Sequence, residues 1–263
     1  VPEILAPGVG CMIPPKFDPA SMQNCRSVEF DMSDYCKQAV QQYKDLAGVD
    51  KPKHAPTPFL PDGSLTEADA SVRGQMAGSA CKVLMKDLWL ARLSRPDVIK
   101  PITDLATKVQ CWSRNEDNML FRLICYLNST SHYRLTGKIG DPPDKLRLLL
   151  FVDADLAGDP GDTKSRSGGY LVLAGPNTWF PITWISRKQT ATSRSTTEAE
   201  IVALAVCLFS EAIPTLRLFD LLLGRKVDLY IMEDNQATIK IVRSGFSPKL
   251  RHVSRTHKIN LDQ

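Results

Sequence analysis

Two carboxylates in the second half of the chain stand where oxygen-liganded metal chemistry would need them. Asp153 ends an apolar run, Leu148 to Val152, that is typical of a buried strand. Asp234 follows a similar run, Val227 to Met232. A carboxylate at the end of a buried strand lies where the sheet meets solvent, although most such residues only cap a turn.

A third carboxylate, Glu200, lies in a segment that predicts a helix. Ser195, Thr196 or Thr197 can cap its first turn. One apolar stripe follows at helical spacing, formed by Ile201, Leu204, Ala205 and Leu208. Glu200 is therefore expected at the edge of the packed face, either partly exposed beside the core or held there for a purpose.

Three acids on two strand ends and one helix can converge at one end of a sheet. Carboxylates that close together repel each other unless a cation lies among them. Oxygen ligands suit Mg²⁺ or Mn²⁺, and two such ions can bind the attacking water and the leaving oxygen of a phosphodiester. From spacing alone, three unrelated acids at element ends is the better interpretation.

Five motifs that occur in a fixed order favour the metal-site interpretation over three unrelated acids. They are F-V-D-A-D-L-A-G-D, S-G-G-Y, W-I-S-R-K-Q, S-T-T-E-A-E-I-V-A-L and E-D-N-Q-A-T-I. Together they closely resemble the ribonuclease H domain of Pol polyproteins from copia-type LTR retrotransposons. By that resemblance Asp153, Glu200 and Asp234 match three of the family's four metal-binding, catalytic carboxylates, and Asp155 and Glu198 match supporting positions.

The resemblance also implies a fold, a reaction and a cofactor. The fold class is α/β (α+β), with a ribonuclease H-like mixed sheet flanked by helices and preceded by a mainly helical region. The reaction is hydrolysis of the RNA strand of an RNA–DNA hybrid by two-metal catalysis with Mg²⁺ or Mn²⁺. The 2′-hydroxyl would distinguish the RNA strand from the DNA strand.

The first half of the chain resembles the segment that joins reverse transcriptase to ribonuclease H in the same polyproteins. The motifs are F-D-M-S-D-Y, A-P-T-P-F, W-L-A-R-L-S-R-P-D-V and L-I-C-Y-L-N-S-T-S-H-Y-R-L. No Y-V-D-D polymerase motif occurs, so this chain is not a reverse transcriptase by itself. The expected partners are an RNA–DNA hybrid and the reverse transcriptase portion of a parent polyprotein.

The chain is expected to have three parts. Residues 1–27, rich in Pro and Gly, predict a loosely ordered segment; residues 28–140 predict the helical connection region, and residues 145–263 the ribonuclease H-like domain. Within the connection region, Asp50 to Ala70 reads as an extended, Pro-rich linker. The G-D-P-P-D segment, Gly140 to Asp144, predicts a loose junction before the first strand.

Composition fits an intracellular protein of the cytoplasm or nucleus. The net charge is +4 with a pI near 8.6, which is compatible with nucleic acid but does not argue for it. Seven scattered cysteines without a C-x-x-C motif indicate reduced thiols. No apolar run approaches transmembrane length and no signal peptide is recognisable, so neither a membrane partner nor secretion is expected.

Basic residues suggest where nucleic acid would bind. Arg187, Lys188 and Arg194 lie between the third strand and the Glu200 helix, where they would pair with phosphates. The basic tail around residues 249–258 is slightly more typical of a solvated segment. His132, His252 and His257 show no ligand spacing with an acid or a cysteine, and no catalytic role is assigned to them.

Three departures from the family pattern predict weak activity or none. Leu156 replaces a usual Trp, Pro214 interrupts a helix, and the chain ends before the segment that bears the fourth carboxylate. No residue here is assigned that fourth role. Two alternatives therefore stay open: a non-catalytic retrotransposon-derived relic that serves as a nucleic-acid-binding or protein-interaction piece, and an unrelated α/β binding protein with structural acids.

Overall fold

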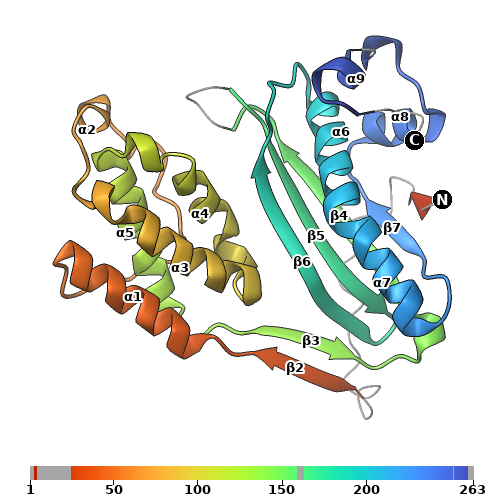
Figure 1. Ribbon diagram of the computed structural model, residues 1–263, viewed down its shortest axis with the longest axis horizontal. Helices are drawn as coiled ribbons and strands as arrows, with labels where there is room; N and C mark the ends of the chain where they lie inside the picture. The colour runs from red at the N-terminus through yellow and green to blue at the C-terminus, as the bar shows by residue number, and fades with distance from the viewer. Residues whose placement is uncertain (1–2, 5–24, 159–162, 251, 260–263) are drawn as a thin grey trace. The chain divides into compact units, whose positions relative to one another are not determined.

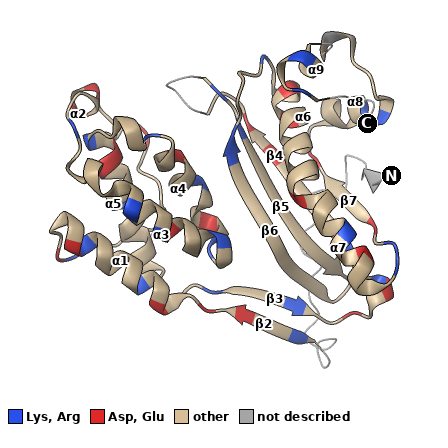
Figure 2. Cartoon of the chain, in the orientation of Figure 1, with Lys and Arg blue, Asp and Glu red and all other residues tan. Residues whose placement is uncertain are grey.

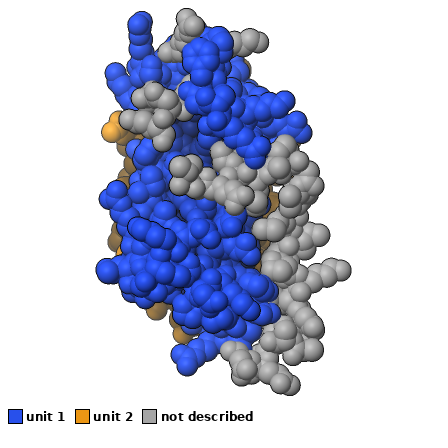
Figure 3. Space-filling view, turned by 90° about the vertical axis from the view of Figure 1, so that its right-hand side faces the viewer, with its two compact units in different colours: residues 1–28, 136–263 blue, residues 29–135 orange. Residues whose placement is uncertain are grey.

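The computed structural model describes residues 3–4, 25–158, 163–250 and 252–259 (Figure 1). The chain forms two compact units, coloured separately in Figure 3. Unit 1 comprises residues 1–28 and 136–263, and unit 2 comprises residues 29–135. Residues 5–24, which make up most of the expected loosely ordered segment, lie outside the described residues.

Unit 2 is helical. Its helices are α1 (Ser33–Ala47), α2 (Glu67–Ala70), α3 (Ala80–Leu93), α4 (Ile99–Ala106) and α5 (Arg114–Ser129). Short 3₁₀ turns join them at Gln75–Gly78, Pro96–Val98 and Val109–Cys111. The apolar faces of α1, α3, α4 and α5 share one core, as their helical periodicity predicts.

The S-R-P-D motif is a structural anchor of this unit. Arg95 is almost fully buried, and its guanidinium donates to the Thr130 carbonyl at 3.0 Å and to Asp97 Oδ1 at 2.9 Å. The Tyr126 hydroxyl donates to the same Asp97 carboxylate at 2.8 Å. A buried guanidinium needs such partners, because an unpaired buried charge is costly. These contacts tie the turn before α4 to the end of α5.

The sheet contains strands from both ends of the chain. Its strands are β1 (Glu3–Ile4), β2 (Arg26–Phe30), β3 (Leu135–Ile139), β4 (Arg147–Asp155), β5 (Arg166–Gly175), β6 (Thr178–Lys188) and β7 (Leu229–Met232). The order across the sheet is β1-β7-β4-β5-β6-β3-β2. Neighbours β4, β5 and β6 are antiparallel, whereas β7 runs parallel to both β4 and β1. This mixed sheet with accompanying helices confirms the predicted α+β fold class.

Helices of unit 1 cover one face of the central strands (Figure 1). They are α6 (Thr196–Cys207), a π-helical turn (Leu208–Ala212) and α7 (Ile213–Leu223). Helices α8 (Gln236–Ser244) and α9 (Val253–Thr256) pack against α6, and 3₁₀ turns lie at Pro143–Lys145 and Pro248–Leu250. The opposite face is aromatic: the rings of Phe151 and Trp179 lie 6.0 Å apart, and those of Tyr170 and Trp184 lie 6.2 Å apart. Both tryptophans thus pack on the sheet.

Pro214 changes the helix type and does not end the helix. The π-helical turn directly precedes α7, where Pro214 occupies the first turn. Proline lacks an N–H and clashes with the preceding turn, and a π-bulge is one way to accommodate that loss. The resulting continuous helix, Thr196–Leu223, has 28 residues, and an 18-residue stretch of it has a mean hydropathy of 1.8. It is long and apolar enough to cross a membrane, contrary to the expectation from sequence, but most of α6 is buried in the core of unit 1.

The expected loose junction at Gly140 to Asp144 is instead hydrogen-bonded to the β5–β6 turn. The N–H groups of Gly140 and Asp141 donate to Thr178 Oγ1 at 3.1 and 3.2 Å, and the Asn177 N–H donates to Asp141 Oδ2 at 2.7 Å. The compact units divide five residues earlier, between Leu135 and Thr136. The Pro-Pro pair follows β3, which ends at Ile139.

Candidate metal centre

Asp153, Glu200 and Asp234 converge at one end of the sheet. One carboxylate oxygen from each lies within 4.8 Å of the others. Asp153 is near the end of β4, Asp234 follows β7, and Glu200 is in the second turn of α6. Acidic residues gather where α6 begins beside the end of β4 (Figure 2). The predicted convergence is therefore present, whereas metal binding and catalysis by these residues remain predictions.

Local sequence explains why these three elements meet. Ser195 caps α6, its hydroxyl accepting the Glu198 N–H at 3.2 Å. Gly169 of β5 lets α6 approach the sheet, because a Cβ there would lie 2.5 Å from the sulfur of Cys207. Asn235 caps α8 by accepting two N–H groups at 3.0 Å, which fixes the turn that carries Asp234.

Glu200 is the buried member of the cluster. It is only 3% exposed, and its Oε2 has no hydrogen-bond partner among the described residues. Burial, followed by the charges of Glu233, Asp153 and Asp234, raises its pKa to about 8, and a backbone hydrogen bond with Ala154 only partly opposes this. Asp153 and Asp234 are exposed. The site therefore has one buried carboxyl group, that of Glu200, and two carboxyl groups exposed to solvent.

Glu233 is a fourth acid near the cluster that sequence reasoning missed. Its Oε1 accepts the Asn235 N–H at 3.0 Å, and its Oε2 is buried without a partner among the described residues. Burial, and then the charges of Asp234 and Asp153, raise its pKa to about 7 against that hydrogen bond. Glu233 directly precedes Asp234 in E-D-N, but a single additional acid at a strand end gives no signal of its own.

The raised pKa values predict that Mg²⁺ stabilises this protein more strongly at higher pH. Below pH 7, Glu200 and Glu233 hold protons that a bound cation would have to displace, and above pH 8 both are ionised. We therefore expect roughly 10 mM Mg²⁺ to raise the melting temperature only slightly at pH 6 and by several degrees at pH 9. Differential scanning fluorimetry across this range measures it, and an increase independent of pH would contradict the proposed site.

Glu198 organises the C-terminal tail, which sequence spacing did not reveal. Its Oε1 lies 3.1 Å from His252 Nε2 and 3.0 Å from His257 Nε2, and its Oε2 accepts the Arg194 N–H at 2.9 Å. Burial pushes the pKa of Glu198 upward, but these hydrogen bonds outweigh it and hold the pKa below its usual value. The expectation that neither histidine is spaced to meet an acid was wrong, because the tail folds back onto α6 over a long sequence separation.

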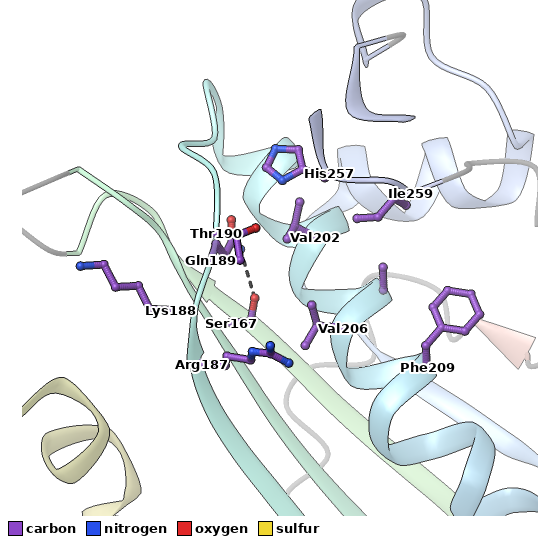
Figure 4. A pocket seen from close by; sticks show the side chains of 11 residues that line it. Ser167, Arg187, Lys188, Gln189, Thr190, Val202, Val206, Phe209, His257 and Ile259 are labelled. Atoms are coloured by element: carbon purple, nitrogen blue, oxygen red, sulfur yellow. Dashed lines mark hydrogen bonds between the residues drawn. The ribbon is translucent and has the colours of Figure 1, made fainter. Parts of the chain in front are cut away.

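Two of the three predicted nucleic-acid contacts line a cavity beside α6 (Figure 4). Its volume is about 260 Å³, and Arg187 and Lys188 lie on its β6 side. The Arg187 side chain points toward α6, and that of Lys188 points away from it (Figure 4). The opposite wall is apolar, formed by Val202, Ala205, Val206, Phe209 and Ile259. Arg194 is exposed and does not line this cavity. Nucleic-acid binding by these three residues stays a prediction.

Comparisons with known proteins find relatives for part of the chain. The chain is 35% identical over 122 residues to the retrovirus-related Pol polyprotein from transposon RE2 of Arabidopsis thaliana, and 34% identical over 122 residues to that from transposon RE1. Each match covers 46% of this chain and 8% of the polyprotein, so the chain spans under a tenth of those relatives.

A shorter relative is matched over most of its length. The secreted RxLR effector protein 161 of Plasmopara viticola is 30% identical over 118 residues, which are 45% of this chain and 78% of that protein. No family model matches the chain, and no solved structure matches it either.

Proposed function

Because the chain belongs to a family of proteins derived from the Pol polyproteins of copia-type retrotransposons, we propose that its carboxylate cluster hydrolyses the RNA strand of RNA–DNA hybrids. The observation that supports this most is the meeting of Asp153, Glu200 and Asp234 within 4.8 Å. These residues are far apart in the sequence and come from three different elements. Three acids that only capped separate turns would not be expected to place their carboxylates next to one another.

The residues present fit divalent metal ions. All three ligands are carboxylates, which suits Mg²⁺ or Mn²⁺ better than a softer metal. Glu200 Oε2 is buried and lacks a partner among the described residues, and the nearest charges around it are also negative. A cation among these oxygens would satisfy that atom and remove the repulsion. When bound, the metal would lower the pKa of a water molecule and stabilise the leaving oxygen of the phosphodiester.

The protein's own residues divide the remaining work. Glu200 is buried and held in place by α6, so it would bind the metal on the side facing the protein core. Asp153 and Asp234 are exposed and face the solvent from which substrate arrives. All three residues lie on or directly beside regular secondary structure, which limits how far their carboxylates can move. Small displacements of a catalytic group from its reactive position already lower the rate. Glu233 adds negative charge beside them and would strengthen cation binding once it is ionised.

Unit 2 has a place in this proposal as a connecting segment. In a polyprotein it would join the nuclease to a reverse transcriptase, and that polymerase portion would be a partner of this chain. The buried Arg95 network makes unit 2 a folded body with its own core and not a flexible linker. This supports a spacer role without assigning any chemistry to unit 2.

The test is a cleavage assay with a labelled 20-base-pair hybrid, a length of roughly two helical turns. We expect the RNA strand to be cut in Mg²⁺ or Mn²⁺, at the weak level that the three departures from the family pattern predict, and not in EDTA, with the DNA strand of the hybrid and a DNA duplex left intact. Circular dichroism must show that the protein is folded. A folded protein whose melting temperature responds to Mg²⁺ but which leaves the RNA intact would refute the nuclease proposal.

A further inference from the structure

A second cavity, within unit 2, has the lining of an anion site. Its volume is about 280 Å³, and it is lined by Lys53, His54, Leu60, Ser64, Asn118, Phe121, Arg122 and Cys125. Lys53 and Arg122 supply two basic side chains, and no aspartate or glutamate among the described residues lines the cavity. The cavity belongs to a different unit from the carboxylate cluster.

The cavity is a built feature, because one face of α5 holds the facing loop. Asn118, Phe121, Arg122 and Cys125 follow one another at helical spacing along α5. The Arg122 side chain donates to the Thr57 carbonyl at 2.8 Å and to Thr57 Oγ1 at 3.0 Å. The Ala55 N–H donates to Ser129 Oγ at 3.1 Å. These bonds fix both walls and orient the guanidinium in advance.

The cations of this cavity are not neutralised by the protein. Lys53 and Arg122 form no ion pair with any of the described residues. Exposed His54 adds a further N–H donor, and Asn118 and Ser64 add neutral polar groups. A fixed guanidinium and a nearby ammonium are the usual recognition groups for a phosphate. The remaining wall, Leu60 and Phe121, offers an apolar surface and a ring face.

We infer that this cavity binds a nucleoside monophosphate, either free or as the 5′-phosphorylated end of a nucleic-acid strand. The phosphate would lie between Lys53 and Arg122, and the base would stack on Phe121, because aromatic rings accept any base on their face. Its volume of about 280 Å³ is slightly below the range of drug-sized pockets. A cavity of this volume suits one nucleotide.

Calorimetry on the full chain in EDTA tests this, since EDTA silences the carboxylate site. AMP should bind more tightly than inorganic phosphate, and adenosine should not bind measurably. Lys53→Gln should weaken AMP binding about 10-fold, the size of one charge-assisted hydrogen bond. Lys51→Gln, an exposed lysine of the same loop that does not line the cavity, should leave binding unchanged.

Further variants and ligands separate the outcomes. Phe121→Leu should weaken AMP but not inorganic phosphate, and a melting curve confirms that each variant is folded. A short RNA with a 5′-phosphate that binds better than AMP identifies a strand end as the ligand, whereas equal binding identifies the free nucleotide. AMP and adenosine binding alike, or AMP binding unchanged in both Lys53→Gln and Arg122→Gln, would overturn the inference. Hybrid cleavage plays no part in any of these readouts.

Discussion

Glu200→Gln is expected to raise the stability of the metal-free protein while abolishing its response to Mg²⁺. Ionised Glu200 is buried among like charges, so its folded-state pKa of about 8 lies well above the ordinary value of 4.5. The destabilisation caused by Glu200 therefore grows as the pH rises from its pKa in the unfolded chain to its pKa in the folded protein. It reaches its full value above pH 8. At pH 8.5 the neutral amide should increase the free energy of unfolding by up to about 5 kcal/mol.

The same substitution should remove hybrid cleavage. Loss of a buried charged ligand is expected to lower the rate about 1000-fold, which corresponds to roughly 4 kcal/mol of transition-state stabilisation. Asp153→Asn should lose activity similarly but gain less stability, because Asp153 is exposed. Opposite signs for stability and activity at one position indicate a site that is retained for its chemistry.

An exposed acid at the other end of β7 provides the control. Asp228→Asn lies outside the cluster and should change neither stability nor cleavage noticeably. Urea denaturation with and without Mg²⁺, together with the cleavage assay, gives both readouts. If Glu200→Gln were less stable than the parent in EDTA, Glu200 would be a structural hydrogen-bonding residue, and the metal-site interpretation would fail.

Sequence predicted the elements of unit 1 well because each has a strong local signal. Short apolar runs ended by acids gave β4 and β7, and the Ser195 cap gave the start of α6. The arrangement of α6 was less predictable. Its expected single stripe fails because most of its residues are buried on several sides: Ala203 and Leu204 pack toward the sheet, whereas Ile201 packs with Leu250 and Val253. Periodicity cannot separate two buried faces of one helix.

The surroundings of the site were the least predictable part. Glu233 touches the cluster only through the turn geometry that Asn235 imposes. The contacts of Glu198 with His252 and His257 cross more than fifty residues, so no spacing rule covers them. Such long-range polar contacts depend on how separate elements pack, and a single sequence records them only as unrelated charged residues.

A buried acid in unit 2 leads to the second large expected effect. Asp87 is 0% exposed, lies on the inward face of α3 beside Val83 and Leu84, and neither of its carboxylate oxygens has a partner among the described residues. Burial raises its pKa to about 7, although Lys86 lowers it. An isolated carboxyl group in an apolar core opposes folding, and it does so most when it is ionised in the unfolded chain.

Asp87→Leu is therefore expected to stabilise unit 2 by about 4 kcal/mol at pH 7.5, since leucine has a similar branched shape and completes the apolar face of α3. The folded pKa is raised, so the cost in the parent protein is absent below pH 3.8 and accumulates until pH 7. The advantage of the variant should shrink accordingly when urea denaturation is repeated at pH 4.5. Asp50→Leu, an exposed aspartate in the loop after α1, should shift stability by less than about 0.5 kcal/mol. A destabilised Asp87→Leu protein would mean that this carboxylate has a partner that supports the fold, and that its burial is not the defect inferred here.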